Sequence, residues 1–300
     1  MMEANARVAL IGCSWISFSA AVVVINKYIL SYTDFSHVIT LAAVHMIVSA
    51  GLSEAYRFTR QKNARLFSTD ANYINAGSGR CFLIAALFSA SLVASNAALT
   101  RLDISSVQII KALNPAVIYA VGIGSKMEKL RRKTIILLPI ICGAVIVAVK
   151  GDLEFRPLGV FLQILCIVLD SIRQLCLQNL LQSGYDSIDV LRIVAPIAAL
   201  FLLSMGSAFE LENISSHHFQ IQHIFPLIVG SGVLAFSLNV CSYAFLKQTS
   251  ALTVSLSGIF KDVLLLGISR AWLGSKVGSE KILGYGVATL CALIHQYWPE

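Results

Sequence analysis

Charged residues are scarce in this sequence. Of its 300 residues only 13% are Asp, Glu, Lys or Arg and 57% are hydrophobic, whereas about a quarter of the residues in ordinary soluble domains are charged. A soluble fold cannot bury that much apolar surface, so the composition indicates an all-α integral membrane protein. A helix needs about 20 apolar residues to cross a bilayer, and ten crossings would use about 200 residues.

Motifs of catalysis and metal binding are also absent. The sequence contains no P-loop, no HExxH and no GxSxG, and no residues pair an obvious nucleophile with a base. Its seven cysteines all lie in apolar stretches, and no two have CxxC spacing, which argues against a disulfide framework and a metal site. We therefore expect no enzyme activity, no cofactor and no metal.

Ten apolar runs predict ten transmembrane helices. Lys111 in the fourth run and Lys261 in the ninth lie half a chain length apart. Five helices followed by five more would place the second half upside down relative to the first. We therefore predict two inverted five-helix repeats, 1–150 and 151–300, which form one domain in the lipid bilayer with a binding site between them. The runs cover about 8–30, 36–56, 81–99, 105–124, 134–150, 158–181, 190–208, 223–246, 251–271 and 282–298.

The basic residues are distributed unevenly between the predicted loops. If both termini are cytosolic, that side receives twelve basic residues and the opposite side only five. This asymmetry follows the positive-inside rule. Topology therefore explains the net charge of +7 better than a nucleic-acid partner does, and we expect no nucleic acid.

Lys111 and Lys261 each lie within a largely uncharged run. A lysine near the bilayer centre costs about 2.5–3.5 kcal/mol on insertion scales, so such residues usually face a polar cavity. Polar residues at three- or four-residue steps, among them Gln108 and Ser257, would share a helix face with these lysines. The pattern favours binding of a small anion, and pairing of each lysine with Asp262 or Asp170 is the structural alternative.

Two further cations are candidates for the same site. Arg173 follows Asp170 by three residues, a spacing at which the two side chains can pair with each other, so substrate contact and structural pairing both stay open. Lys27 lies near the end of the first run and could bind substrate or extend to the membrane surface. Asp262 points away from Lys261 around the helix, which favours a gating or structural role.

The sequence also resembles a known family. Ser95-Asn96 with the run SVQIIKALNP at 106–115, and Asn239 with TSALT at 249–253 and GIFKD at 258–262, are similar to signatures of the triose-phosphate and nucleotide-sugar transporter family, within the drug/metabolite transporter superfamily. Asn26-Lys27 and Arg173 fit as well. The resemblance implies a ten-helix inverted-repeat carrier that works by alternating access and strict exchange, and Lys111 and Lys261 match the lysines that hold the substrate phosphate.

One departure from the family pattern indicates which branch of the family the sequence resembles. Asp262 stands where plastid members have an arginine, which favours the Golgi or endoplasmic-reticulum branch. Golgi is the first expectation. The resemblance then implies an antiporter that exchanges a nucleotide sugar, with a mild preference for a UDP-sugar, for a nucleoside monophosphate; exchange of phosphorylated sugars or other organic anions is the alternative. The expected substrate-binding residues are Lys111, Lys261, Arg173, Lys27, Gln108, Ser257 and Asn96.

The chain's last apolar run contains small residues at four-residue steps. Gly284, Ala288 and Ala292 would let another helix approach closely. This stripe would serve packing within one chain or a homodimer.

Overall fold

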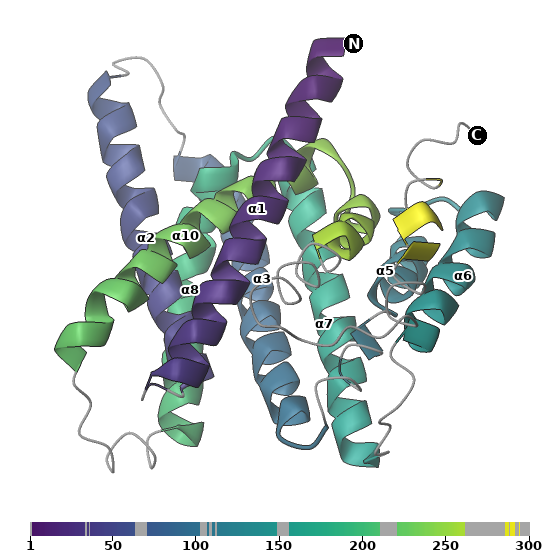
Figure 1. The fold of residues 1–300 in the computed structure, drawn as a ribbon. Coiled ribbons are helices and arrows are strands. Elements are labelled where there is room, and N and C mark those ends of the chain that lie inside the picture. The colour runs from purple at the N-terminus through teal and green to yellow at the C-terminus, as the bar shows by residue number, and fades with distance from the viewer. Residues whose placement is uncertain are drawn as a thin grey trace. The chain divides into compact units, whose positions relative to one another are not determined.

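In the computed structural model, every element of regular structure among the described residues is a helix (Figure 1). The described residues are 2–33, 35, 37–63, 71–102, 107, 110–111, 113–148, 156–210, 221–261, 286–287, 289–291 and 294. They form helices α1 (Met2–Tyr32), α2 (Val38–Asn63), α3 (Ala71–Leu99), α5 (Asn114–Gly124), α6 (Arg132–Ala148), α7 (Pro157–Gln182), α8 (Ser187–Phe209) and α10 (Ile221–Gln248), followed by the helix Ala251–Lys261.

Six of these helices contain segments long and apolar enough to cross a membrane. Each segment has 22 to 26 residues, and at 1.5 Å per residue this length exceeds the ~30 Å hydrocarbon core. The prediction of an all-α membrane protein is confirmed, and every one of the ten predicted ranges contains helical residues. The inverted five-helix repeats remain a prediction. The six segments are Ala6–Leu30, Val38–Arg60, Ser78–Leu99, Pro157–Gln182, Ser187–Phe209 and Ile224–Gln248.

The predicted continuous helix over 105–124 is wrong in one respect. Residues 110 and 111 are helical, but the chain turns at Leu113, and α5 begins at Asn114 with Pro115 in its first turn. Proline lacks the N–H that would bond the carbonyl four residues earlier, and its ring clashes with that carbonyl. Here that carbonyl belongs to Lys111. Lys111 therefore lies just before a helix start and not inside a continuous helix.

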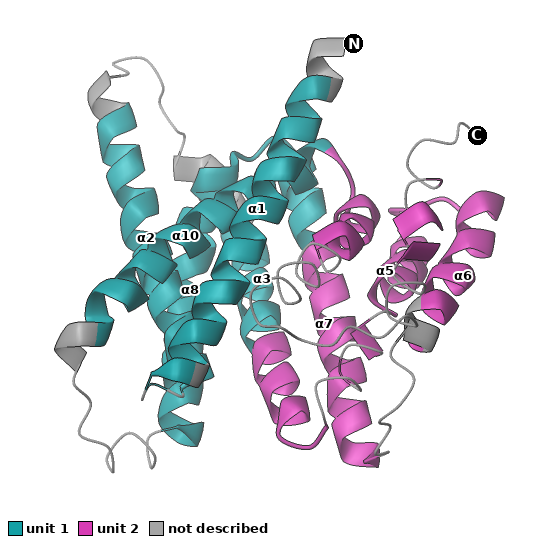
Figure 2. Ribbon diagram, in the orientation of Figure 1, with its two compact units in different colours: residues 1–89, 176–248 teal, residues 90–175, 249–300 magenta. Residues whose placement is uncertain are grey.

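One compact unit consists of residues 1–89 and 176–248 (Figure 2). In it α2 packs against α8 and α10, and α1 packs against α10. The approach of α2 and α10 is close, because a Cβ added at Gly232 would lie 2.9 Å from Val48 Cγ2. Trp15 of α1 stacks on Phe245 of α10 with ring centroids 5.8 Å apart. The unit is therefore held by apolar contacts along its helices.

Charged groups in this first unit join helices near their ends. Glu210, directly after α8, accepts hydrogen bonds from the backbone N–H groups of Ile39 (2.8 Å) and Thr40 (2.9 Å) and from the Thr40 hydroxyl (2.7 Å). These are N–H groups that the start of a helix leaves unbonded. Towards the other end of the same helix pair, Arg192 of α8 lies 3.3 Å from Glu54 of α2.

The second compact unit consists of residues 90–175 and 249–300 (Figure 2). Its apolar core contains Leu102, Val107, Ile110 and Ile167. The start of α7 fits closely here, since a Cβ added at Gly159 would lie 2.7 Å from Leu102 Cγ. Each unit contains residues from both halves of the chain, so the units reflect which helices pack together and do not correspond to the two predicted repeats. The repeat boundary at 150/151 stays a prediction.

Candidate functional site

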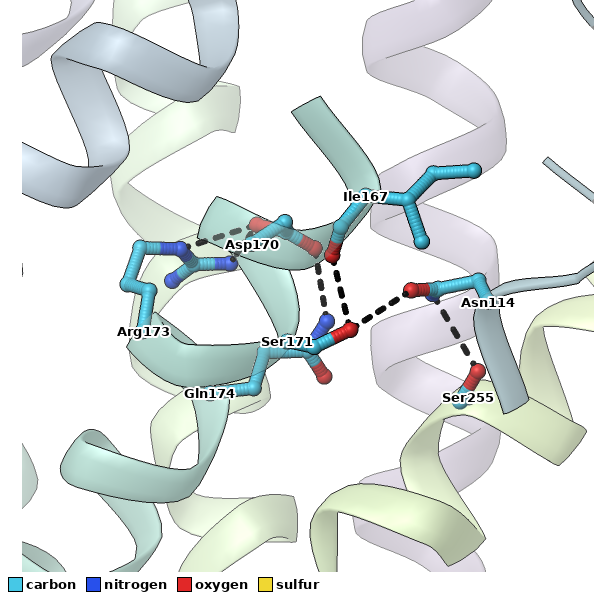
Figure 3. Close-up of polar contacts among 7 residues, drawn as sticks. All are labelled: Asn114, Ile167, Asp170, Ser171, Arg173, Gln174 and Ser255. Carbon is cyan, nitrogen blue, oxygen red and sulfur yellow. Dashed lines mark hydrogen bonds and ion pairs between the residues drawn. The ribbon is translucent and has the colours of Figure 1, made fainter. Parts of the chain in front are cut away.

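The centre of α7 carries a bonded group of polar side chains (Figure 3). Asp170 Oδ1 accepts hydrogen bonds from Arg173 Nε (2.9 Å) and Nη2 (2.7 Å), and Asp170 Oδ2 accepts one from Gln174 Nε2 (2.7 Å). Both side chains of the ion pair are largely buried, with 29% of Asp170 and 17% of Arg173 exposed. The pairing that their three-residue spacing allowed is present through Oδ1, and Gln174 bonds the other oxygen of the carboxylate.

Asn114 links three helices of the second unit (Figure 3). Its Nδ2 donates to Ser255 Oγ at 3.2 Å, and its Oδ1 accepts a long hydrogen bond of 3.5 Å from Ser171 Oγ. Ser171 is fully buried and also bonds the Ile167 carbonyl at 2.7 Å. The first residue of α5 thereby connects α7 with the helix Ala251–Lys261, which ends in a predicted site lysine.

Lys111 lies in the same electrostatic environment as this group. The charges of Lys111, Asp170 and Arg173 all act on the thiol of Cys166, a buried residue of α7. The Lys111 side chain is exposed. No carboxylate of the described residues lies within ion-pair distance of it. Since an ammonium group facing lipid would be costly, its proximity to α7 favours a polar cavity as its surroundings.

Among the described residues, the charges that act on the Cys166 thiol do not balance. Two cations, Lys111 and Arg173, accompany one carboxylate, Asp170, whose oxygens are both occupied. The excess positive charge suits an anion with several acceptor oxygens, and phosphate groups meet that need with short, charge-assisted hydrogen bonds. Among these residues nothing forms a nucleophile–base pair, so the arrangement fits binding and not chemical conversion.

Lys261 and Ser257 come from the last described helix of this unit. Lys261 is half-buried and Ser257 is buried. Their four-residue spacing places them on one face of the helix. The hydrogen bond from Asn114 to Ser255 fixes this helix to α5 two residues before Ser257. A role of either residue in binding remains a prediction.

Of the other predicted site residues, the structure describes Asn96 and Lys27. Asn96 of α3 belongs to the second unit, and its buried Nδ2 has no hydrogen-bond partner among the described residues, as expected for a group that meets a ligand or water. Lys27 is exposed near the end of α1 in the first unit. Gln108 and Asp262 lie outside the described residues.

The prediction missed three polar residues of the second unit. Ser171 and Ser255 complete the Asn114 connection. Gln163 of α7 is fully buried, and neither polar atom of its side chain has a partner within the described part of the chain. Gln163, Ile167 and Ser171 follow at four-residue steps, so a glutamine on the polar face of an apolar run was the available signal.

Apolar spanning helices with a cationic polar group inside them define the class, a multi-pass helical membrane protein, and such a group is suited to small anions. The chain belongs to the Triose-phosphate Transporter family, whose sequence pattern matches residues 6–296. Members of this family are transporters and not enzymes, as the sequence predicted.

Curated relatives cover nearly the whole chain. A probable sugar phosphate/phosphate translocator of Arabidopsis thaliana is 31% identical over 284 residues, which are 92% of this chain and 79% of the relative. UDP-uronic acid transporter 1 of the same plant is 26% identical over 291 residues, 92% of this chain and 90% of the relative. A crystal structure with 14% sequence identity aligns with a TM-score of 0.73 over 97% of this chain and 96% of its own, which shows the shared fold.

Proposed function

We propose that this protein is a secondary antiporter that exchanges phosphorylated sugars or nucleotide sugars by alternating access. The observation that carries the proposal is that, among the described residues, the cations Lys111 and Arg173 and the single carboxylate Asp170 all act on Cys166, and both oxygens of that carboxylate already accept hydrogen bonds. In each conformation a bound phosphate would neutralise the excess positive charge. The protein would then expose the site to one side of the membrane at a time.

Two substrate classes have specific support. The sugar phosphate/phosphate translocators among the relatives favour a phosphorylated sugar exchanged for phosphate. The UDP-uronic acid transporter among the relatives, together with Asp262 directly after Lys261, favours a nucleotide sugar, with a UDP-sugar preferred, exchanged for the nucleoside monophosphate. Both classes carry phosphate oxygens, and they differ in whether a nucleobase contributes to binding.

A counterflow assay separates these classes. Purified full-length protein would be reconstituted in vesicles loaded with phosphate, a sugar phosphate or a nucleoside monophosphate, and uptake of labelled sugar phosphates and UDP-sugars would be measured for each load. Uptake of UDP-sugars driven only by a nucleoside monophosphate would establish the nucleotide-sugar function. Sugar-phosphate uptake driven by phosphate would establish the alternative, and uptake independent of every load would rule out antiport.

Location and orientation belong to the same proposal. We place the protein in the Golgi membrane, or alternatively in the endoplasmic reticulum, because Asp262 directly follows Lys261. We place both termini in the cytosol because the twelve-to-five charge asymmetry follows the positive-inside rule. A terminal tag accessible after selective permeabilisation of the plasma membrane would support this orientation. Homodimerisation through Gly284, Ala288 and Ala292, which lie outside the described residues, would be tested by cross-linking in the bilayer.

A further inference from the structure

The loop between α5 and α6 is the most basic segment of the second unit. With the first two residues of α6 included, the loop 125–133 reads SKMEKLRRK, with five cations and one carboxylate, Glu128. The charge asymmetry of the sequence explains on which side of the membrane such a loop lies. It does not explain how the loop is folded.

Backbone hydrogen bonds and Tyr119 give the loop a defined shape. The buried Tyr119 hydroxyl donates to the Lys129 carbonyl (3.1 Å) and accepts from the Arg131 N–H (2.7 Å). The Gly122 carbonyl accepts the N–H groups of Met127 (2.9 Å) and Glu128 (3.0 Å). The cations therefore come from a structured turn and not from a loose connection.

The one carboxylate of the loop is folded inward. A Cβ added at Gly122 would lie 2.8 Å from Glu128 Cγ, so the absence of a side chain at Gly122 makes room for Glu128 against α5. Burial raises the pKa of the Glu128 carboxyl, and the neighbouring Arg131 charge opposes that shift. The acid that could neutralise the loop thus contributes little to its outer surface.

The outward side combines cations with an apolar residue. Lys126, Lys129 and Arg132 are exposed, and Leu130 between them is 70% exposed. By contrast, two cations near the end of α2 lie close to carboxylates: Arg60 lies 3.6 Å from Asp186, and Arg57 lies 3.5 Å from Glu54. Long basic side chains beside an exposed leucine are suited to the membrane interface, where the charge meets headgroups and the leucine meets acyl chains.

We propose that the loop 125–133 binds the headgroups of anionic phospholipids in the leaflet that it faces. A juxtamembrane cation attracts an anionic surface by an amount equal to roughly fivefold in affinity. Because Tyr119 and Gly122 hold the turn, the cations would contact lipid without first ordering the chain, which lowers the cost of binding. This site is separate from the anion site near Cys166 and does not depend on the proposed substrate.

The test uses purified full-length protein in detergent micelles that contain phosphatidylcholine alone or phosphatidylcholine mixed with phosphatidylserine. A lipid that binds the folded state raises the melting temperature, so the shift is measured against phosphatidylserine content. For the triple variant Lys126→Gln, Lys129→Gln and Arg132→Gln we expect roughly a hundredfold weaker apparent affinity for phosphatidylserine. The matched control, Arg7→Gln with Arg57→Gln and Arg60→Gln, removes the same charge elsewhere and should keep the wild-type response.

Two further variants, added salt and a headgroup compound without acyl chains test the proposal further. Leu130→Ser keeps every charge and should weaken the response less than the triple variant. The response should persist in Lys111→Ala and should fall as salt increases, because exposed charges are screened. An equal loss in the control variant would overturn the proposal. So would loss of the response in Lys111→Ala, or an equal shift produced by glycerophosphoserine, which has no acyl chains.

Discussion

The two compact units use charged side chains in opposite ways. In the unit of residues 1–89 and 176–248 the carboxylates of Glu54, Asp186 and Glu210 join neighbouring segments at or towards helix ends. In the unit of residues 90–175 and 249–300 the Asp170–Arg173 pair lies in the middle of α7. The charges of this pair and of Lys111 all act on the thiol of Cys166. Near a helix end water and headgroups solvate a charge, whereas the middle of a spanning helix offers neither.

This difference distinguishes charges that hold helices together near their ends from charges at the candidate site in the middle of α7. The ion pair between Arg192 and Glu54 joins α2 and α8 towards one end of the pair, and although Arg192 is only 14% exposed, its partner Glu54 is 57% exposed, so the pair is suited to stabilisation. Charges at mid-span bear a desolvation cost that pairing offsets only in part. Retention of charges there fits the proposed binding of an anion, for which Lys111 is available as a cation uncompensated by any carboxylate of the described residues.

The largest expected effect follows from removing the uncompensated cation. Lys111→Ala should reduce exchange in proteoliposomes by roughly a hundredfold, as expected for loss of charge-assisted hydrogen bonds to substrate. The melting temperature should change little, because the side chain is exposed. Lys111→Arg keeps the charge and should retain more activity, and Arg7→Ala in α1 is the control. Wild-type exchange by a well-folded Lys111→Ala protein would contradict the site assignment.

The next effect tests whether the mid-span ion pair serves stability or function. Asp170→Asn leaves the Arg173 guanidinium without its carboxylate and should destabilise the protein by about 2 kcal/mol. Adding Arg173→Gln removes the unpaired charge and should restore much of that stability. We expect exchange to stay low in the double variant. Recovery of both stability and exchange would show that the pair is purely structural.

A steric change addresses the scaffold alone. Gly232→Ala places a methyl group 2.9 Å from Val48 Cγ2, and overpacking of this kind costs about 1–3 kcal/mol. Gly230 lies two residues away on α10 with no atom within 4 Å of an added Cβ, so Gly230→Ala is the matched control and should be neutral. Thermal unfolding of both variants measures the difference, and equal melting temperatures would show that the two helices can separate without cost.

The smallest expected effect concerns the carboxylate after α8. Glu210→Gln retains one acceptor oxygen and loses the charge that faces the first N–H groups of α2, so we expect a loss of about 1 kcal/mol. Hydrogen exchange should increase at Ile39 and Thr40 and stay unchanged around Asn114. Faster exchange throughout the chain would instead show that the residue supports the whole fold.

Sequence reasoning succeeded where the information is local. Hydropathy located helical residues in all ten ranges, and three-residue spacing anticipated the bond between Asp170 and Arg173. The break at Leu113 was missed although Pro115 signals it. The bonds from Asn114 to Ser255 and from Thr40 to Glu210 join residues 141 and 170 positions apart. Helical periodicity gives the face of one helix and carries no information about its partner, so these contacts could not be predicted.

The discontinuous make-up of the first unit has a consequence for biosynthesis. Translation delivers residues 1–89 first, and their partners in 176–248 only after the whole segment 90–175 has emerged. Another 170 residues must therefore be synthesised after Thr40 before the carboxylate of Glu210 is available to the first N–H groups of α2. Because domains mature in the order in which their parts leave the ribosome, α1 and α2 must persist in the membrane as unfinished helices until α8 and α10 arrive.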